Sequence, residues 1–308
     1  MSEKRWVVRA GDGRTVGDVL ARMREDARAI DEGRVFLGKK RVLRLDTPVR
    51  EGDAVRVGAA ERRTPVTILF EDGGLVACVK PAGIPTVPDH AGGAHALVAE
   101  VARTIGRRAD ALRVTSRLDR EVSGVVVFAL DAEAEARLRR ARDEGRYVRR
   151  YVAIGAASAS RVAPGTVWDA PIGGGKDPRH RAPNGPDAKA ARTRVVFAKY
   201  TDMAVLLAVE PVTGRTHQIR VHAAHAGMPL FGDRDYGGPT RLTLPGGRVV
   251  SLARIALHAG WVRVPDAKGE PLVARAPIPD ELARLWSELG GSGDDWPVAL
   301  AEDLAARA

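Results

Sequence analysis

Residues 115–130 have the sequence TSRLDREVSGVVVFAL, in which a polar segment runs directly into an apolar one. The six apolar residues from Val125 onward predict a buried strand of a sheet. Asp119 lies between Arg117 and Arg120, whose positive charges favour its ionised form. A carboxylate held ionised beside a buried strand is suited to act as a nucleophile or a base. A structural salt bridge is the alternative, and the spacing alone favours it.

More β-rich runs lie on either side of this stretch. The runs at 66–70 and 75–80 are separated by Glu71-Asp72-Gly73-Gly74, which predicts a hairpin turn. Residues 195–197 and 205–209 predict further strands, and residues 132–144 have helical composition. Strands and helices therefore mix without a regular βαβ alternation. We expect an α+β fold with a mixed, largely antiparallel central sheet flanked by helices and loops.

The first sixty residues predict a small α/β module. Residues 16–23 have apolar positions at helical spacing, and Thr15 is the expected N-cap. Residues 34–42 predict a hairpin whose turn carries consecutive cations, and residues 49–57 predict a turn and a closing strand. The expected division is a module at 1–60, a linker at 61–65, a second domain at 66–290 and a C-terminal tail at 291–308, either frayed or a short helix.

Composition narrows the class of protein. The chain has 308 residues, of which 44% are hydrophobic and 29% charged, so a globular protein of about two domains is expected. No run approaches the roughly 18 apolar residues of a membrane helix, and the first residues lack the apolar core of a signal peptide. The single cysteine, Cys78, lies in an apolar run and cannot form an internal disulfide. We expect a cytoplasmic protein without disulfides.

The charge balance is strongly basic. Lys and Arg number 49 against 39 Asp and Glu, a net charge of +10 with a pI near 10.2. This value is typical of nucleic-acid binders, although a coding bias toward Arg, Ala and Gly is the alternative. Residues 173–192, rich in Gly and Pro, predict a basic surface loop. The cations in and beside it are Lys176, Arg179, His180, Arg181, Lys189, Arg192 and Arg194.

Two further segments carry polar residues that an ordinary core would not contain. Residues 211–222, PVTGRTHQIRVH, place Thr216, Gln218 and Arg220 on one face if the run is extended. Residues 80–88, KPAGIPTVP, predict a strand that ends at Lys80 in a stiff loop. Both segments are therefore candidates for a functional site.

Together these segments resemble the RluA-type family of RNA pseudouridine synthases. Residues 117–124, RLDREVSG, resemble the signature around the family's catalytic aspartate, and residues 213–222 with 227–233 resemble its second long signature. Three shorter motifs match at 80–83, 150–153 and 257–259, so that five ordered motifs span roughly residues 66–285. Ser116 departs from the usual histidine and Val122 from the usual threonine, which affects neighbours of the reacting group only.

The resemblance implies a pseudouridine synthase fold at 66–290 and isomerisation of uridine to pseudouridine in structured RNA. The reaction involves no redox change, so no cofactor and no metal are implied. Asp119 is implied as nucleophile or base, Arg220 as its ion-pair partner, and Tyr151 as an aromatic face and hydroxyl near the base. Arg117 resembles the residue that fills the gap left by the flipped nucleotide. The other implied substrate-binding residues are Leu118, Ile219, Leu257, His217, Gln218 and Lys80.

The N-terminal module resembles the alpha-L RNA-binding module. Its helix, basic hairpin and closing strand carry this resemblance, with Lys39, Lys40 and Arg41 as the expected RNA contacts. Lys176, Arg179, Arg181, Lys189 and Arg192 are expected to contact phosphates, and a solvated charged surface is the alternative for each. The expected partner is RNA, with ribosomal RNA favoured and transfer RNA possible. The protein is expected to be a monomer and not to contact a membrane.

Three other functions are weaker. His217, His222, His225 and His258 suggest a metal-dependent hydrolase, but no acidic residue lies between His217 and His225 and the spacing is not that of a helical zinc motif. Residues 173–176, GGGK, lack the spacer and the Ser or Thr of a phosphate loop. A non-catalytic RNA-binding or ribosome-assembly protein that kept the fold is the remaining alternative. The joint presence of Asp119, Tyr151 and Arg220 argues against it.

Overall fold

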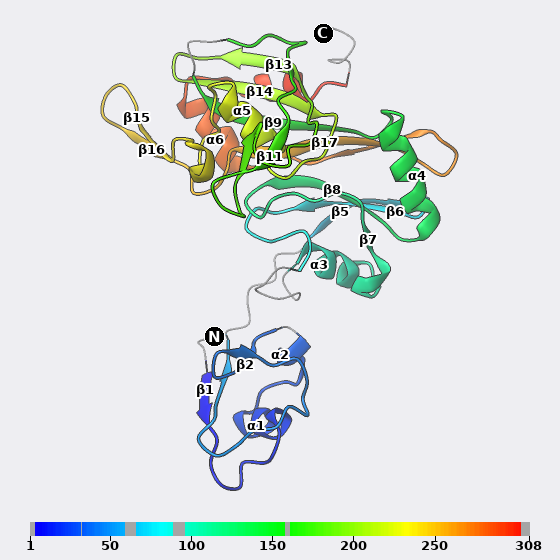
Figure 1. Ribbon diagram of the computed structural model, residues 1–308, viewed down its shortest axis with the longest axis vertical. Coiled ribbons are helices and arrows are strands. Elements are labelled where there is room, and N and C mark those ends of the chain that lie inside the picture. The colour runs from blue at the N-terminus through cyan, green and yellow to red at the C-terminus, as the bar shows by residue number, and fades with distance from the viewer. Residues whose placement is uncertain (1–3, 32, 59–65, 89–95, 158–160, 303–308) are drawn as a thin grey trace. The chain divides into compact units, whose positions relative to one another are not determined.

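The structure is a computed structural model and describes residues 4–31, 33–58, 66–88, 96–157 and 161–302. The chain divides into two compact units, one of residues 1–65 and 87–109 and one of residues 66–86 and 110–308. Both are drawn in Figure 1. The expected linker at 61–65 lies outside the described residues. Within the described ranges, no helix is both long and apolar enough to span a bilayer.

The first unit contains a four-stranded antiparallel sheet in the order β1-β4-β2-β3. Its strands are β1 (Lys4–Val7), β2 (Val35–Leu37), β3 (Lys40–Arg41) and β4 (Ala54–Val57), and its helices are α1 (Val16–Met23), α2 (Arg28–Asp31) and α3 (Leu97–Thr104). The side chain of Thr15 accepts a hydrogen bond from Asp18 N, while the Asp18 carboxylate accepts one from Thr15 N. This capping box confirms the predicted start of α1.

The predicted basic hairpin of this unit exists, but its turn is shorter than expected. Leu37 pairs with Lys40, so the turn consists of Gly38 and Lys39 alone. The prediction of a turn with three consecutive cations is therefore right only for Lys39, since Lys40 and Arg41 belong to β3. Arg41 lies 5.5 Å from the centre of the Phe36 ring, within the range of a cation–π contact.

The second unit is built on one large sheet (Figure 1). The main path of the sheet runs β10-β13-β14-β9-β17-β8-β6-β5, with β18 paired to β17 and β7 to β8. Among the described strand pairs only β8 and β17 run parallel, which confirms the predicted mixed, largely antiparallel sheet. The strands are β5 (Thr67–Asp72), β6 (Leu75–Lys80), β7 (Arg113–Val114), β8 (Ser123–Ala129), β9 (Val148–Ala156), β10 (Val167–Trp168), β13 (Thr193–Tyr200), β14 (Ala204–Pro211), β17 (Leu257–Pro265) and β18 (Pro271–Arg275).

Helices cover this sheet through two apolar clusters. Helix α4 (Ala132–Asp143) contributes Leu138 to a cluster with residues of β6, β8 and β17. Helices α6 (Asp280–Glu288) and α7 (Asp295–Ala299) contribute Trp286 and Trp296 to a cluster with residues of β9 and β14. Fully burying one large apolar side chain stabilises the fold by about 1.5–3 kcal/mol, so these helices are firmly attached. Of the two alternatives for the tail beyond residue 290, residues 295–299 form the short helix.

Two segments near the candidate site differ from the expectation. Residues 211–222 are not one extended run, because β14 ends at Pro211 and helix α5 (Gln218–His225) begins seven residues later. Gln218 and Arg220 therefore point to different sides, since a helix turns about 100° per residue. The expected basic loop contains a hairpin of β11 (Ile172–Gly174) and β12 (Arg181–Pro183). The remaining elements are η1 (Ala109–Ala111), η2 (Arg234–Tyr236), β15 (Arg241–Thr243) and β16 (Val249–Ser251).

Candidate active site

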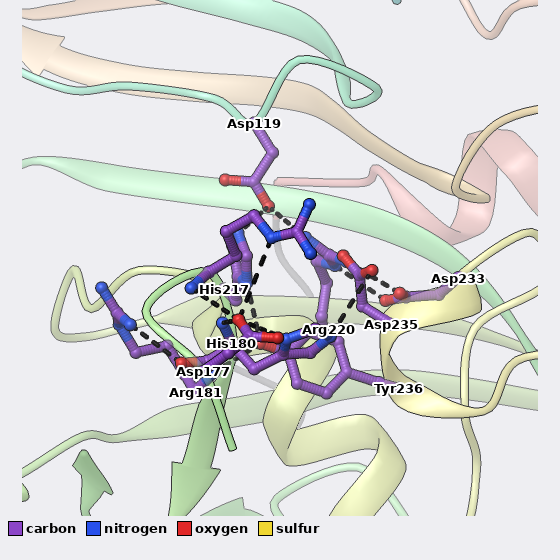
Figure 2. Close-up of polar contacts among 10 residues, drawn as sticks. Asp119, Asp177, His180, Arg181, His217, Arg220, Asp233, Asp235 and Tyr236 are labelled. Carbon is purple, nitrogen blue, oxygen red and sulfur yellow. Dashed lines mark hydrogen bonds and ion pairs between the residues drawn. The ribbon is translucent and has the colours of Figure 1, made fainter. Parts of the chain in front are cut away.

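Asp119 and Arg220 meet although they are 101 residues apart in the chain. Arg220 Nη1 donates to Asp119 Oδ2 at 3.1 Å (Figure 2). Asp119 lies in the loop that leads into β8, and Arg220 lies in the first turn of α5. The Arg220 side chain is 5% exposed, whereas 30% of the Asp119 side chain remains exposed. The structure thus brings together the pair that the resemblance implies and leaves its carboxylate within reach of a substrate.

Arg220 has further partners besides Asp119. Its Nε and Nη2 donate to the two carboxylate oxygens of Asp233 at 2.7 and 2.8 Å, and Nη2 also donates to Asp235 at 2.8 Å. The Tyr236 ring centre lies 4.8 Å from the guanidinium carbon. Burial alone lowers the pKa of Arg220, but the hydrogen bonds and charge of Asp233 and the charge of Asp119 raise it above its usual value. Arg220 therefore supplies a permanent positive charge beside Asp119.

His217 is a second polar side chain beside Asp119, and the resemblance implies that it binds the substrate. Its Nε2 lies 3.8 Å from Asp119 Oδ2, and its Nδ1 shares a 2.7 Å hydrogen bond with the Tyr236 hydroxyl (Figure 2). Burial lowers the pKa of His217, and the charge of Arg220 adds to this effect against the opposing charge of Asp119. The residue has φ of 58°, a left-handed conformation that is uncommon outside glycine and is found at functional sites. It precedes α5 directly.

Tyr151 and the apolar residues of the candidate site are buried. Tyr151 lies in β9 opposite Ala259 of β17 and is 6% exposed. Burial raises the pKa of Tyr151, and the charge of Asp119 acts in the same direction, so the phenol is neutral near pH 7. The three apolar residues predicted to contact the substrate are 4–8% exposed: Leu118, Ile219 and Leu257.

Two residues expected to contact the substrate have all their polar groups occupied within the protein. Lys80 Nζ is fully buried and donates to the carbonyls of Pro81, Arg120 and Val122 at 2.7–3.0 Å. The Gln218 amide makes four hydrogen bonds, to residues 192, 193, 213 and 215. An ammonium has three donors and a carboxamide two donors and two acceptor sites, so both groups are saturated. Their role as substrate contacts stays a prediction; in the structure each side chain supports the loops around Asp119 and Arg220.

The departures from the family pattern lie next to Asp119. Ser116 Oγ is 3.2 Å from the Tyr147 hydroxyl, with which it forms a hydrogen bond. Val122 is buried, and its carbonyl accepts the hydrogen bond from Lys80. Arg117, expected to replace the flipped nucleotide, is exposed on the same loop. Val122 N donates to the backbone carbonyl of Asp119 at 3.1 Å. In the described part of the chain, no side-chain hydrogen bond found for Ser116, Arg117 or Val122 reaches the Asp119–Arg220 ion pair.

The cations expected to bind RNA are mostly exposed. Lys176, Arg179, Lys189 and Arg192 are solvent-accessible around the β11–β12 hairpin, and Lys39 and Lys40 are exposed in the first unit. Arg41 and Arg181 are half-buried. Arg181 N donates to the Tyr236 hydroxyl at 3.0 Å, which links the hairpin to the residues around Arg220.

The histidines that suggested a metal site form hydrogen bonds with different groups of the protein. His222 hydrogen-bonds with Thr193 Oγ1 and the Ala170 carbonyl, and His258 Nδ1 with Ser123 Oγ at 2.8 Å. Neither side chain shares a partner with His217. In the part of the chain that the structure describes, no group of three or more His, Cys, Asp or Glu side chains is placed to hold a metal ion.

Sequence reasoning missed three residues around Arg220, namely Asp233, Asp235 and Tyr236. Asp233 belongs to residues 227–233, which resemble the family's second signature, but no role follows for it from that resemblance. A signal existed, because Asp233 follows the apolar residues Leu230 and Phe231 and is flanked by Gly232, a context in which a carboxylate needs a partner. The identity of that partner depends on tertiary contacts.

Comparison with known proteins assigns the chain to a class of enzymes. Residues 74–225 match the family model for RNA pseudouridylate synthase. An uncharacterized RNA pseudouridine synthase of Bacillus subtilis is 34% identical over 250 residues, which cover 77% of this chain and 79% of that relative. Ribosomal large subunit pseudouridine synthase D of Xanthomonas campestris is 35% identical over 265 residues, covering 81% and 75%. The structure of human RNA Pseudouridylate Synthase Domain Containing 1 matches with a TM-score of 0.58 at 22% identity, covering 79% of this chain and 98% of that one, which shows a shared fold.

Proposed function

The chain belongs to the RluA-type family of RNA pseudouridine synthases, and from this premise we propose that it isomerises uridines of large-subunit ribosomal RNA with Asp119 as the reacting carboxylate. The name of the Xanthomonas relative supports the choice of RNA, and transfer RNA is the alternative substrate. We place this activity in the cytoplasm. The catalytic domain is proposed at residues 66–290, with an RNA-binding module at 1–60.

The observation that carries this proposal is the Asp119–Arg220 ion pair of 3.1 Å with a carboxylate that remains 30% exposed. Arg220 is already paired with Asp233 and Asp235, so a purely structural role does not require Asp119. Among the described residues, Asp119 Oδ1 accepts no hydrogen bond, whereas Oδ2 faces Arg220 (Figure 2). One carboxylate oxygen is thus oriented by the protein and the other is available for chemistry.

The reaction needs few groups. The bond between uracil N1 and ribose C1′ breaks, the base turns, and C5 bonds to C1′; a proton leaves C5 and N1 gains one. A half-exposed carboxylate fits either of two first steps, attack on C1′ or removal of a proton. The Tyr151 ring is proposed to contact the base, with its neutral hydroxyl near the carbon that loses a proton. The target nucleotide must leave its stack, and Arg117 is proposed to fill the gap.

RNA is proposed to bind along exposed cations of both units. In the first unit, Arg41 and Arg56 lie 5.5 and 5.6 Å from the Phe36 ring centre, beside exposed Lys39 and Lys40. In the second unit the cations surround the β11–β12 hairpin. Phosphate contacts of this kind position a nucleic acid without reading its sequence. Binding by a single copy of the chain remains the expectation.

The test is replacement of Asp119 by Asn or Ala. We expect a single-turnover rate at least about 1,000-fold below that of the unmodified protein, because the reacting oxygen or its charge is lost, with RNA affinity within about threefold. Asp143→Asn, on the exposed surface of α4, is the matched control and should keep the full rate. Pseudouridine mapping of total RNA from cells with and without the gene identifies the uridine.

Two results would contradict the proposal. Pseudouridine formation by Asp119→Asn at the rate of the unmodified protein would remove Asp119 from the chemistry. A chain that binds ribosomal RNA but yields the same pseudouridine map in both kinds of cell would favour a ribosome-assembly role.

A further inference from the structure

We propose that Asp233 is a positioning residue that aims the guanidinium of Arg220 at Asp119. This inference rests on the proposed function, because it assigns a role in the reaction of Asp119. Asp233 does not touch the reacting atoms. It acts through Arg220, and its effect is therefore on the orientation of one charge.

The hydrogen bonds of Arg220 define this role. Arg220 has three nitrogens, and Asp233 binds two of them with its two oxygens, Nε at 2.7 Å and Nη2 at 2.8 Å. Such a fork of two parallel hydrogen bonds fixes both the position and the plane of the guanidinium. The third nitrogen, Nη1, then points to Asp119 at 3.1 Å (Figure 2). The direction of the bond to Asp119 follows from the fork to Asp233.

Burial and backbone hydrogen bonds hold Asp233 in a fixed position. Its side chain is fully buried, its N–H donates to the Leu230 carbonyl at 3.1 Å, and its own carbonyl accepts from Gly238 N at 2.7 Å. Gly232 has φ of +78°, and a Cβ there would lie 1.8 Å from the Arg254 carbonyl oxygen, so only glycine fits. The turn before η2 is therefore held in one conformation, and the Asp233 carboxylate with it.

The other contacts of Arg220 cannot replace this fork. Asp235 makes one hydrogen bond to Arg220 and is 50% exposed, and exposed ion pairs hold their geometry weakly. Tyr236 covers one face of the guanidinium at 4.8 Å, which leaves rotation within its plane unrestricted. Without the fork, Nη1 has no fixed direction, and the positive charge beside Asp119 is no longer held in place.

The experiment measures the single-turnover rate and RNA affinity of the full chain with Asp233→Asn, using a ribosomal RNA transcript that contains the mapped uridine. We expect a rate at saturating RNA about 100-fold lower, since a misplacement of about 1 Å costs this much. RNA affinity should stay within about threefold, because Asp233 is buried away from RNA. The loss should therefore appear in the rate constant at saturating RNA and not in the RNA dissociation constant.

A matched control exists in the same unit. Arg150 and Glu210 form another buried ion pair, 1% and 5% exposed, in which Arg150 Nε and Nη2 bind one Glu210 oxygen at 3.0 and 2.6 Å. Glu210→Gln removes a negative charge from beside a similarly buried arginine, as Asp233→Asn does. We expect a similar loss of stability in both variants, but a rate within about threefold of the unmodified protein for folded Glu210→Gln.

Asp233→Glu serves if Asp233→Asn fails to fold. It keeps the charge that compensates Arg220 and moves the carboxylate by one methylene, so the rate should fall with RNA affinity unchanged. A folded Asp233→Asn or Asp233→Glu with the full rate would overturn the inference. If an Asp233 variant keeps the full rate while Asp119→Asn is inactive in the same assay, only the role of Asp233 is contradicted. If Asp119→Asn is active, the proposed function itself is contradicted.

Discussion

His258 shows at the scale of one residue how burial sets a charge state. Its side chain is fully buried in β17, and its Nδ1 shares a hydrogen bond with Ser123 Oγ of β8. Burial lowers the pKa of His258 to about 4, and the nearby charge of Arg254 acts in the same direction. The neutral ring therefore belongs to the folded state, whereas in the unfolded chain the ring has its ordinary pKa of about 6.5.

This difference predicts a loss of stability in acid. Protons bind the unfolded chain more readily, so the contribution of His258 is complete above about pH 6.5 and is lost as the pH falls toward 4. We expect the free energy of unfolding to drop by about 3 kcal/mol from this group between pH 7 and pH 4. Urea unfolding at several pH values measures it. His258→Asn should lack this part of the slope, whereas His225→Asn, at an exposed position, should keep it. Identical slopes in His258→Asn and the unmodified protein would contradict the prediction.

At the scale of elements, the junction of β8 and β17 holds the loop of Asp119. These strands run parallel, with Ser123 opposite His258 and Gly124 opposite Ala259. Gly124 has φ of +121°, and a Cβ there would lie 2.3 Å from the Ala259 carbonyl oxygen. The close approach of two backbones therefore requires glycine at this position, five residues after Asp119.

Gly124→Ala should consequently destabilise the second unit by about 3 kcal/mol or more, because strain and a backbone clash act together. The matched control is Gly145→Ala, where φ is +71° but nothing lies within 4 Å of the added Cβ. It should cost about 1 kcal/mol, from the backbone conformation alone. Urea unfolding of both variants measures the difference. Equal losses of unfolding free energy in the two variants would contradict the prediction, because they would mean that the backbone at the junction of β8 and β17 shifts to relieve the clash.

Helix α5 shows why one element was not predictable. Polar and apolar residues alternate at Gln218, Ile219, Arg220, Val221 and His222, a pattern compatible with an extended run. The structure forms a helix, and all five side chains are buried. Alternation indicates a strand only when one face is exposed. Here the polar residues have partners inside the protein, so hydropathy alone could not distinguish the two.

At the scale of the whole molecule, the net charge of +10 has a measurable consequence. If exposed cations around the β11–β12 hairpin neutralise phosphates, the logarithm of the RNA binding constant falls linearly with the logarithm of the salt concentration. Replacing Lys176 and Arg179 by Gln should lower that slope by about 1 to 2, with about one unit lost for each phosphate contact. Filter binding from 50 to 300 mM salt measures it. Removal of two exposed cations of α4, in Arg139→Gln with Arg140→Gln, should leave the slope unchanged. If both double variants lower the salt slope equally, the cations act through the overall positive charge of the protein and not through a binding surface around the β11–β12 hairpin.

The class of fold, strands β2 to β6, β8, β13 and β14, helices α1 and α4, and the family follow from the amino-acid sequence, because these depend on local periodicity, turn chemistry and ordered motifs. The pairing of Asp119 with Arg220 was also predictable, but only through the family resemblance. The hydrogen bonds that occupy Lys80 and Gln218 within the protein, and the two that Asp233 accepts from Arg220, depend on contacts between distant segments and could not be read from the sequence. A hydrogen bond is satisfied by whichever group lies within about 3 Å, and that neighbour is set by the packing of distant segments.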